Sequence, residues 1–180
     1  VQNIDTINKT VSTNQHIASL RQPSFEWIEI NRTVDEVLAL SRHRLSSRQI
    51  MIHRRFTSDL PRVLMDVSEI QAIILQVINN AMDNMRNGGL LNISTTFLEP
   101  TAGPDNRPMV RINIRDTGAG INPEIADNLM APFERNGDTR LGVSLFTAAQ
   151  VVKKYGGRFT VRNASDHGTS VSITLPALEN

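Results

Sequence analysis

Residues 116–121 read Asp-Thr-Gly-Ala-Gly-Ile and directly follow an apolar, alternating stretch that predicts a strand. An Asp at a strand end, followed by glycines at alternate positions, forms a turn in which the backbone closely approaches a neighbour. The sequence alone leaves two interpretations open. One is an ordinary Asp-Thr-Gly turn, and the other is a turn that contacts a ligand.

A second chemical signal is a polar stripe on an otherwise apolar helical stretch. Gln76, Asn80, Asp83 and Asn84 are spaced so that they share one helical face. A solvent-facing stripe is one explanation, although such a stripe usually carries Lys and Glu. Amide oxygens suit a hydrated Mg²⁺ that is held beside phosphates, which is the alternative.

Two further segments offer weaker signals. Gly142 opens a helical pattern after a polar loop, and free N–H groups at a helix start can hold phosphate. Thr169 follows Gly168 at the entry to the final predicted strand. A loop before an ordinary amphipathic helix explains the first segment equally well, and a hairpin turn explains the second.

The elements that must position these residues follow from hydrophobic periodicity. Helical spacing is predicted for 1–21, 29–47, 68–86, 123–130 and 141–155, and strands for 50–57, 63–65, 90–98, 109–115, 158–163 and 169–175. This order predicts an α/β protein, a two-layer α/β sandwich with a mixed, mostly antiparallel sheet, preceded by a helical arm.

Local signals make these predictions specific. Asn31 or Thr33 is expected to cap the helix over 29–47, and Asp66 or Ser68 the helix over 68–86. The apolar face of the first of these helices is expected to comprise Val34, Val37, Leu38 and Leu40. Leu91, Ile93 and Thr95 are expected to share one face of the strand over 90–98, and Val110, Ile112 and Ile114 are expected to point inward from the strand over 109–115.

Composition narrows the function classes. The chain has 180 residues, of which 39% are hydrophobic, and a formal net charge of +1. That charge gives no electrostatic reason to expect a nucleic-acid partner. Cysteine is absent, which excludes disulfides, thiolate metal sites and a cysteine nucleophile. No apolar run approaches the roughly 18 residues of a membrane span, and the first 20 residues are too polar for a signal peptide.

Together the segments are more specific than any one of them. Residues 30–176 resemble the ATP-binding catalytic domain of sensor histidine kinases, whose superfamily includes gyrase, mismatch-repair and heat-shock chaperone ATPases. QVINNAMDNM is similar to the N box, DTGAGI to the G1 box, APFERN to the F box and RLGVSLF to the G2 box. GGRFTVRN and GTSVSITLP match the terminal hairpin.

The resemblance implies ATP and Mg²⁺ as cofactors and phosphoryl transfer to a histidine as the reaction. It implies that Asn80 ligates Mg²⁺, with Gln76 one turn earlier as its catalytic companion, and that Asp116 accepts a hydrogen bond from the adenine amino group. Phe133 would anchor the lid over the site. The implied nucleotide-binding set is Asn80, Asp83, Asn84, Asp116, Gly118, Gly120, Ile121, Phe133, Arg140, Leu141, Gly142 and Thr169.

One departure from the family pattern keeps a second function open. In the segment similar to the G2 box, Arg140 replaces a glycine and only Gly142 remains. The guanidinium could pair with a phosphate, or its bulk could prevent closure of a short lid. The alternative is therefore a degenerate pseudokinase module that binds nucleotide weakly or not at all and acts in dimerisation or partner docking.

Residues 1–24 resemble part of the dimerisation and phosphotransfer helical hairpin, and 25–180 would be the ATP-binding domain. His16 lacks the acidic neighbour of a phosphoacceptor, so that histidine is expected on a helix upstream of this chain. The implied partners are a second copy, through the N-terminal helix, and a response regulator, with no nucleic acid. The implied location is cytoplasmic, with membrane attachment only through upstream segments.

Overall fold

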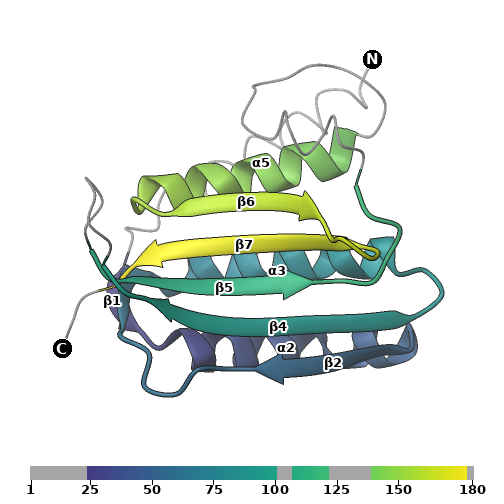
Figure 1. Cartoon of the computed structure of the whole chain (residues 1–180), viewed down its shortest axis with the longest axis horizontal. Coiled ribbons are helices and arrows are strands. Elements are labelled where there is room, and N and C mark those ends of the chain that lie inside the picture. The colour runs from purple at the N-terminus through teal and green to yellow at the C-terminus, as the bar shows by residue number, and fades with distance from the viewer. Residues whose placement is uncertain (1–23, 101–106, 122–138, 178–180) are drawn as a thin grey trace, which may run out of the picture.

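The computed structural model describes residues 24–100, 107–121 and 139–177. It confirms the predicted α/β fold, in which three helices pack on one face of a mixed sheet (Figure 1). The elements are β1 (Phe25–Ile28), α2 (Ile30–Ser47), β2 (Ile50–Arg55), β3 (Val63–Asp66), α3 (Val67–Asn84), β4 (Gly89–Leu98), β5 (Met109–Arg115), α5 (Thr139–Lys154), β6 (Arg158–Asn163) and β7 (Thr169–Pro176).

The main sheet has the strand order β2-β4-β5-β7-β6. Only the β2–β4 pair is parallel, and the other three pairs are antiparallel. Alternation places every second residue on the helix side. The predicted inward face of β5 is buried there, and so is the face that Leu91, Ile93 and Thr95 share on β4. This inner face carries Leu91, Ile93, Thr95, Val110, Ile112, Ile114, Val171, Ile173, Phe159 and Val161.

Helix α3 is the centre of the core and carries the polar stripe. Its apolar residues are buried against the sheet and against the neighbouring helices α2 and α5. At its start the Asp66 side chain accepts a hydrogen bond from the Ser68 N–H at 2.8 Å, which decides between the two predicted caps. After its end Gly88 adopts a φ of +84°, which favours glycine.

The start of α2 differs from the sequence prediction. Glu29 is the N-cap residue and makes no side-chain capping bond, and Asn31 and Thr33 lie inside the helix. Thr33 instead donates a hydrogen bond from Oγ1 to the Glu29 carbonyl oxygen at 3.2 Å. The inclusion of Leu40 in the apolar face was also wrong, because Leu40 is 74% exposed. Hydrophobic spacing alone did not show how wide the buried stripe of α2 is.

β1, which no sequence pattern indicated, pairs with β3 as a separate two-stranded sheet. The strand is only four residues long, so it carries too few alternations to stand out. Phe25, Trp27 and Leu64 remain exposed on this small sheet, with the Phe25 ring edge-on to Tyr155 at 6.0 Å between centroids.

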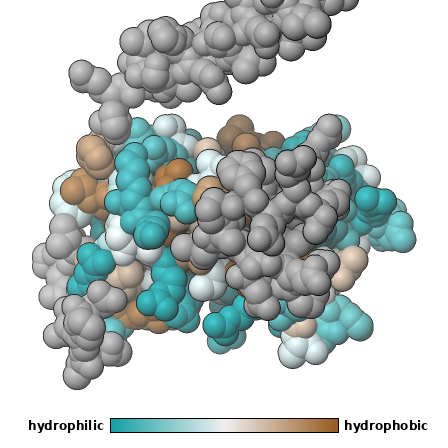
Figure 2. All heavy atoms as spheres, turned by 90° about the horizontal axis from the view of Figure 1, so that it is seen from above, coloured by the Kyte–Doolittle hydropathy of each residue, from teal (hydrophilic) through white to brown (hydrophobic). Residues whose placement is uncertain are grey.

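Elsewhere the surface is mixed. Figure 2 shows one side of the molecule, on which hydrophilic residues predominate and apolar residues appear as small separate patches. Within the described ranges, no helix is long and apolar enough to cross a membrane. The predicted arm over 1–24 and the short helix over 123–130 lie outside the described residues apart from Ser24, which is exposed.

Candidate functional site

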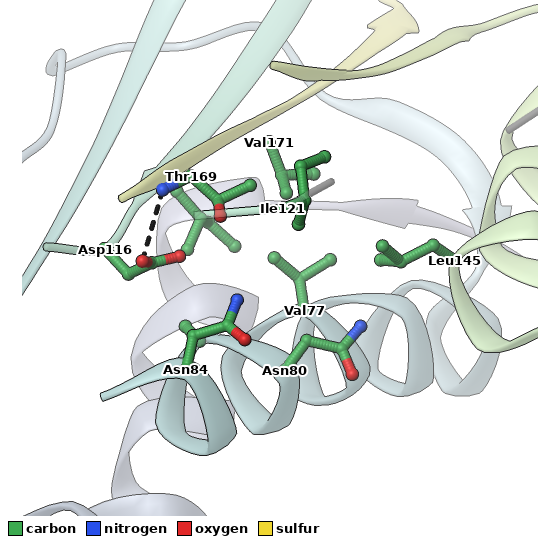
Figure 3. Close-up of a pocket in the computed structure, with 10 residues that line it drawn as sticks. Val77, Asn80, Asn84, Asp116, Ile121, Leu145, Thr169 and Val171 are labelled. Atoms are coloured by element: carbon green, nitrogen blue, oxygen red, sulfur yellow. Dashed lines mark hydrogen bonds between the residues drawn. The ribbon is translucent and has the colours of Figure 1, made fainter. Parts of the chain in front are cut away.

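A pocket opens between the inner face of the sheet, α3 and the first half of α5 (Figure 3). Six lining residues are apolar and four are polar. The polar ones are Asn80 and Asn84 from α3, Asp116 from the end of β5 and Thr169 from the start of β7. The apolar ones are Val77, Ala81, Ile114, Ile121, Leu145 and Val171. Segments more than 80 residues apart in the chain therefore meet here.

Asp116 is the buried carboxyl group of the pocket, with only 4% of its surface exposed. Its Oδ1 accepts hydrogen bonds from the Gly118 N–H at 2.8 Å and the Thr169 N–H at 3.2 Å. Burial raises the pKa of this carboxyl above its usual value, and those two hydrogen bonds oppose the shift. The carboxyl group is thus fixed in orientation by backbone groups and largely shielded from water.

Thr169 supplies an unsatisfied polar atom beside this carboxyl. Its Oγ1 is fully buried and has no hydrogen-bond partner in the protein. Such a group carries a free-energy cost unless a ligand or an ordered water satisfies it. Asp116 and Thr169 together offer an acceptor and a hydroxyl at one end of an apolar pocket, which suits a flat heterocycle with polar edges.

The glycines after Asp116 approach protein rather than open space. A Cβ on Gly118 would lie 2.6 Å from the carbonyl oxygen of Asn84, so this glycine lets the turn pack against the end of α3. Gly120 has a φ of +80°, and a Cβ there would lie 2.9 Å from Asn163 Oδ1. Both glycines are therefore required to hold the turn in place, whatever occupies the pocket.

Asn163 and Gly168 are site residues that sequence reasoning missed. Asn163 Oδ1 accepts from the Ile121 N–H and its Nδ2 donates to the Ile121 carbonyl, both at 2.8 Å. This pair of bonds fixes Ile121 in the pocket wall. Gly168 packs directly on the Asp116 backbone. The available sequence signal was the Asn and the Gly that flank the turn of the terminal hairpin.

The polar stripe of α3 divides between two directions. Asn80 and Asn84 face the pocket (Figure 3). Asp83 is exposed and pairs with Arg48 Nη1 at 3.0 Å, so it lies outside the lining. Gln76 is also outside the lining. The predicted nucleotide role of Asp83 and catalytic role of Gln76 stay predictions, and the structure brings neither side chain to the pocket wall.

Helix α5 directs its N-terminus toward the same pocket. Leu145 lines the pocket, and Arg140, Leu141 and Gly142 lie within the turn and a half that precedes it. Their side chains are outside the described part of the structure, as is the whole of Phe133. The free N–H groups of a helix start can hold an anion, which is what the first turn of α5 offers near this pocket.

The described polar side chains of the pocket suit a metal ion only when a bound ligand supplies further oxygen atoms. Among the described residues no group of three or more His, Asp or Glu side chains could hold a metal ion by itself. Asn80 contributes an amide side chain at the pocket. Mg²⁺ is often held by one or two protein oxygens together with phosphate and water, so this pocket fits Mg²⁺ as part of a nucleotide complex.

Comparison with known proteins gives concordant results. The family described as "Histidine kinase-, DNA gyrase B-, and HSP90-like ATPase" matches residues 65–179. Sporulation kinase D of Bacillus subtilis is 27% identical over 179 residues, covering 97% of this chain and 33% of the relative. The chain spans only 17–39% of the lengths of the first curated relatives that it matches.

Solved histidine kinases share the fold. Full-length ShkA in complex with AMPPNP superposes with a TM-score of 0.72 at 18% identity, covering 100% of this chain and 40% of that one. Histidine kinase ThkA in complex with the response regulator TrrA also gives 0.72 at 18%, covering 98% and 49%. With the family match over residues 65–179 and this architecture around the pocket, the protein belongs to the histidine kinase-, DNA gyrase B- and HSP90-like ATPases, as a catalytic ATP-binding domain of the sensor histidine kinase type.

Proposed function

We propose that this domain binds ATP with Mg²⁺ in the pocket between α3, α5 and the sheet, and provides its γ-phosphoryl group to a histidine outside this chain. The observation that carries the proposal is the buried Asp116 carboxyl beside the unpartnered Thr169 hydroxyl. The AMPPNP complex of ShkA, which shares the fold, also supports it.

The sheet end of the pocket would hold adenine. Asp116 accepts two backbone hydrogen bonds through Oδ1, so its other oxygen is the one that can accept from an exocyclic amino group. The Thr169 hydroxyl would gain a partner from the base or from a bridging water. Ile121, Val171 and Leu145 provide apolar contacts for the base.

The helical end of the pocket would hold the phosphates. Asn80 would contribute an amide oxygen to Mg²⁺, and Asn84 a polar contact to the ribose and phosphate side. The N-terminus of α5 would face the phosphate oxygens, where its dipole is favourable to negative charge. Bound Mg²⁺·ATP supplies the transferable phosphoryl group, and these residues orient it and balance its charge.

Replacing Asn80 tests the metal assignment. We expect wild type to bind an ATP analogue more tightly with Mg²⁺ than without it, and Asn80→Ala to lose roughly tenfold in affinity with Mg²⁺, because a water must replace the lost amide oxygen. Calorimetric titrations with and without Mg²⁺ measure both effects. Asn87→Ala, an exposed asparagine beyond α3, is the matched control. Equal binding by all three proteins contradicts the assignment, and no binding by wild type favours the pseudokinase alternative.

Replacing Arg140 distinguishes an active nucleotide site from a degenerate one. Arg140 lies in the first turn of α5, where a guanidinium and the helix start both favour an anion. We expect Arg140→Gly to weaken ATP binding several-fold and to leave adenosine binding unchanged, because only the phosphates interact with this end. Competition titrations with the two ligands measure the difference. A gain in ATP affinity would instead assign the chain to the degenerate module.

The remaining roles concern the partners, the domain limits and the location of the protein. The histidine kinase ThkA, which shares this fold, has been crystallised with the response regulator TrrA. That complex supports a response regulator as the recipient of the phosphoryl group. We also propose a homodimer through the segment 1–24, an ATP-binding domain over 25–180 and a cytoplasmic location. These assignments rest on the sequence resemblance of the arm and of the whole domain to sensor kinases.

A further inference from the structure

The five-stranded sheet has one face that none of the helices α2, α3 and α5, the helices of the described residues, covers. Figure 1 looks onto this face, with the strands in front of α2 and α3. None of the residues in β2, β4, β5, β6 and β7 is Asp or Glu, although the whole chain carries 18 acidic residues. Acidic side chains are thus confined to helices, loops and the small sheet, and the strands contribute arginine as their main charged residue.

Strand register arranges four of these arginines in a rectangle, which we call the arginine quartet. One row runs across three strands as Arg111, Thr174, Arg158, and another as Arg115, Ser170, Arg162. The row between them is Asn113, Ser172, Thr160. These positions alternate with the buried apolar residues of the same strands, so they lie on the face away from the helices.

The dimensions of the quartet follow from sheet geometry. Arg111 and Arg115 are four residues apart on one strand, or about 13 Å, and the two arginines of a row are two strands apart, or about 10 Å. The quartet residues Arg111, Arg158 and Arg162 are exposed. The Arg115 side chain is 33% exposed. Hydroxyl and amide side chains fill the space between the four guanidinium groups.

One of the four charges is partly neutralised within the protein. Arg115 Nη2 forms an ion pair with Asp166 in the turn between β6 and β7, while its buried Nε has no partner. No ion pair within the described residues involves Arg111, Arg158 or Arg162. On β2, His53 and Arg55 extend the basic surface to the sheet edge, since they pair with Asn92 and Ser94 in register.

We propose that this face is a docking surface for the acidic surface of a partner protein, with the arginine quartet as its centre. Arginine is suited to bidentate pairing with carboxylates, and arginine is enriched at protein interfaces whereas lysine is depleted. The surrounding Ser, Thr and Asn side chains provide hydrogen bonds without opposing charge.

Other anionic partners fit the surface less well. Proteins that bind single-stranded nucleic acid stack bases on aromatic side chains. The only aromatic residues of these strands are Phe97 and Phe159. Phe159 is buried on the inner face, and Phe97 faces the same side as the buried Val110, so neither lies on the arginine face. Duplex recognition uses an element that enters a groove, whereas this face is a broad sheet.

Acidic helical peptides test the proposal. We would titrate the protein at low salt with a peptide that carries Glu at positions i and i+7 on one face, about 10.5 Å apart, and with an isomer whose Glu residues are scattered around the helix. We expect tighter binding of the first peptide, weakening with added salt. Arg111→Gln/Arg158→Gln should lose roughly tenfold in affinity for it.

The controls separate this surface from the nucleotide pocket. Arg32→Gln/Arg42→Gln on α2 changes the net charge by the same amount and should bind the peptide as wild type does. Arg111 and Arg158 lie at the strand ends remote from Asp116 and Thr169, so their replacement should leave binding of an ATP analogue unchanged. Equal peptide affinity in both double variants, or no wild-type binding, overturns the proposal. So does quartet-dependent binding of a DNA duplex or phosphatidylserine vesicles without binding of the acidic peptide.

Discussion

Asp116→Asn is expected to abolish adenine selection while leaving the fold intact. Asparagine keeps the Oδ1 acceptor for the Gly118 and Thr169 N–H groups, so the turn retains its hydrogen bonds. Its amide nitrogen replaces the second carboxyl oxygen, and a donor there faces the donor amino group of adenine. Loss of a hydrogen bond to a charged acceptor costs about 1.5–3 kcal/mol, or roughly 10- to 150-fold in Kd.

Base preference makes this result specific. Guanine carries an acceptor oxygen where adenine carries an amino group, so Asp116→Asn should lose affinity for an ATP analogue and gain relative affinity for the GTP analogue. Calorimetric titration of both nucleotides measures the change. Asp35→Asn is the matched control, because Asp35 is exposed on α2 and pairs with Arg54 Nη1 at 2.6 Å. An unchanged preference in Asp116→Asn would remove adenine recognition from this residue.

The same variant is expected to change how stability depends on pH. Burial raises the pKa of Asp116, so the folded state holds this proton up to a higher pH than the unfolded chain does. As pH rises from the unfolded value of 3.8 through the raised folded value, wild type loses stability relative to Asp116→Asn. Chemical denaturation of both proteins from pH 4 to 7 should therefore show that the free energy of unfolding of wild type falls relative to that of Asp116→Asn as pH rises.

Gly168→Ala is expected to destabilise the domain strongly. Gly168 has a φ of +86°, and a Cβ there would lie 2.0 Å from the backbone carbonyl oxygen of Asp116. Backbone strain at positive φ and the forced displacement of β5 from β7 together cost roughly 2–5 kcal/mol. The melting temperature should drop by about 5–20 °C for a domain of this size. Any folded fraction should bind nucleotide poorly, because Asp116 and Thr169 shift.

Comparison with Gly156→Ala separates the effect of the steric clash in Gly168→Ala from the effect of backbone strain. Gly156 also has a positive φ, of +69°, but its Cβ would meet only the end of the flexible Arg107 side chain, at 3.1 Å. This control should therefore show the conformational cost alone and melt closer to wild type. Equal melting temperatures for the two variants would mean that the contact between Gly168 and Asp116 is not needed for the fold.

Elements with strong periodicity were predictable from sequence, and short or context-dependent features were not. The alternation in β4 and β5 repeats often enough to identify both strands and the residues that share a face of each. β1 is too short for such a repeat, and its pairing with β3 joins residues about 40 positions apart. Leu40 lies close to the buried Val37 and Ser41 in the helical pattern and is still exposed, since about 100° of rotation separates it from Ser41.

The candidate site shows the same division. Asp116, Thr169, Asn80 and Asn84 could be chosen by residue type and position in their motifs, and the fold brings all four to one pocket. Asp83 fits the same helical stripe but pairs with Arg48 outside the lining, because about 100° of rotation separates neighbouring helical residues. Asn163 carries no motif of its own, and only its contact with Ile121 reveals its role.

By itself the sequence determined the fold class, the order of the main elements and the family, because local periodicity and residue spacing are written along the chain. Tertiary structure alone decided which polar groups meet, which glycines contact backbone and how charge is distributed. A net charge of +1 gives no electrostatic reason to expect a nucleic-acid partner, whereas the strand register gathers arginines on one face without acidic residues on the same strands. The physical reason is that charge balance is a sum over the chain, whereas a field depends on where the charges lie.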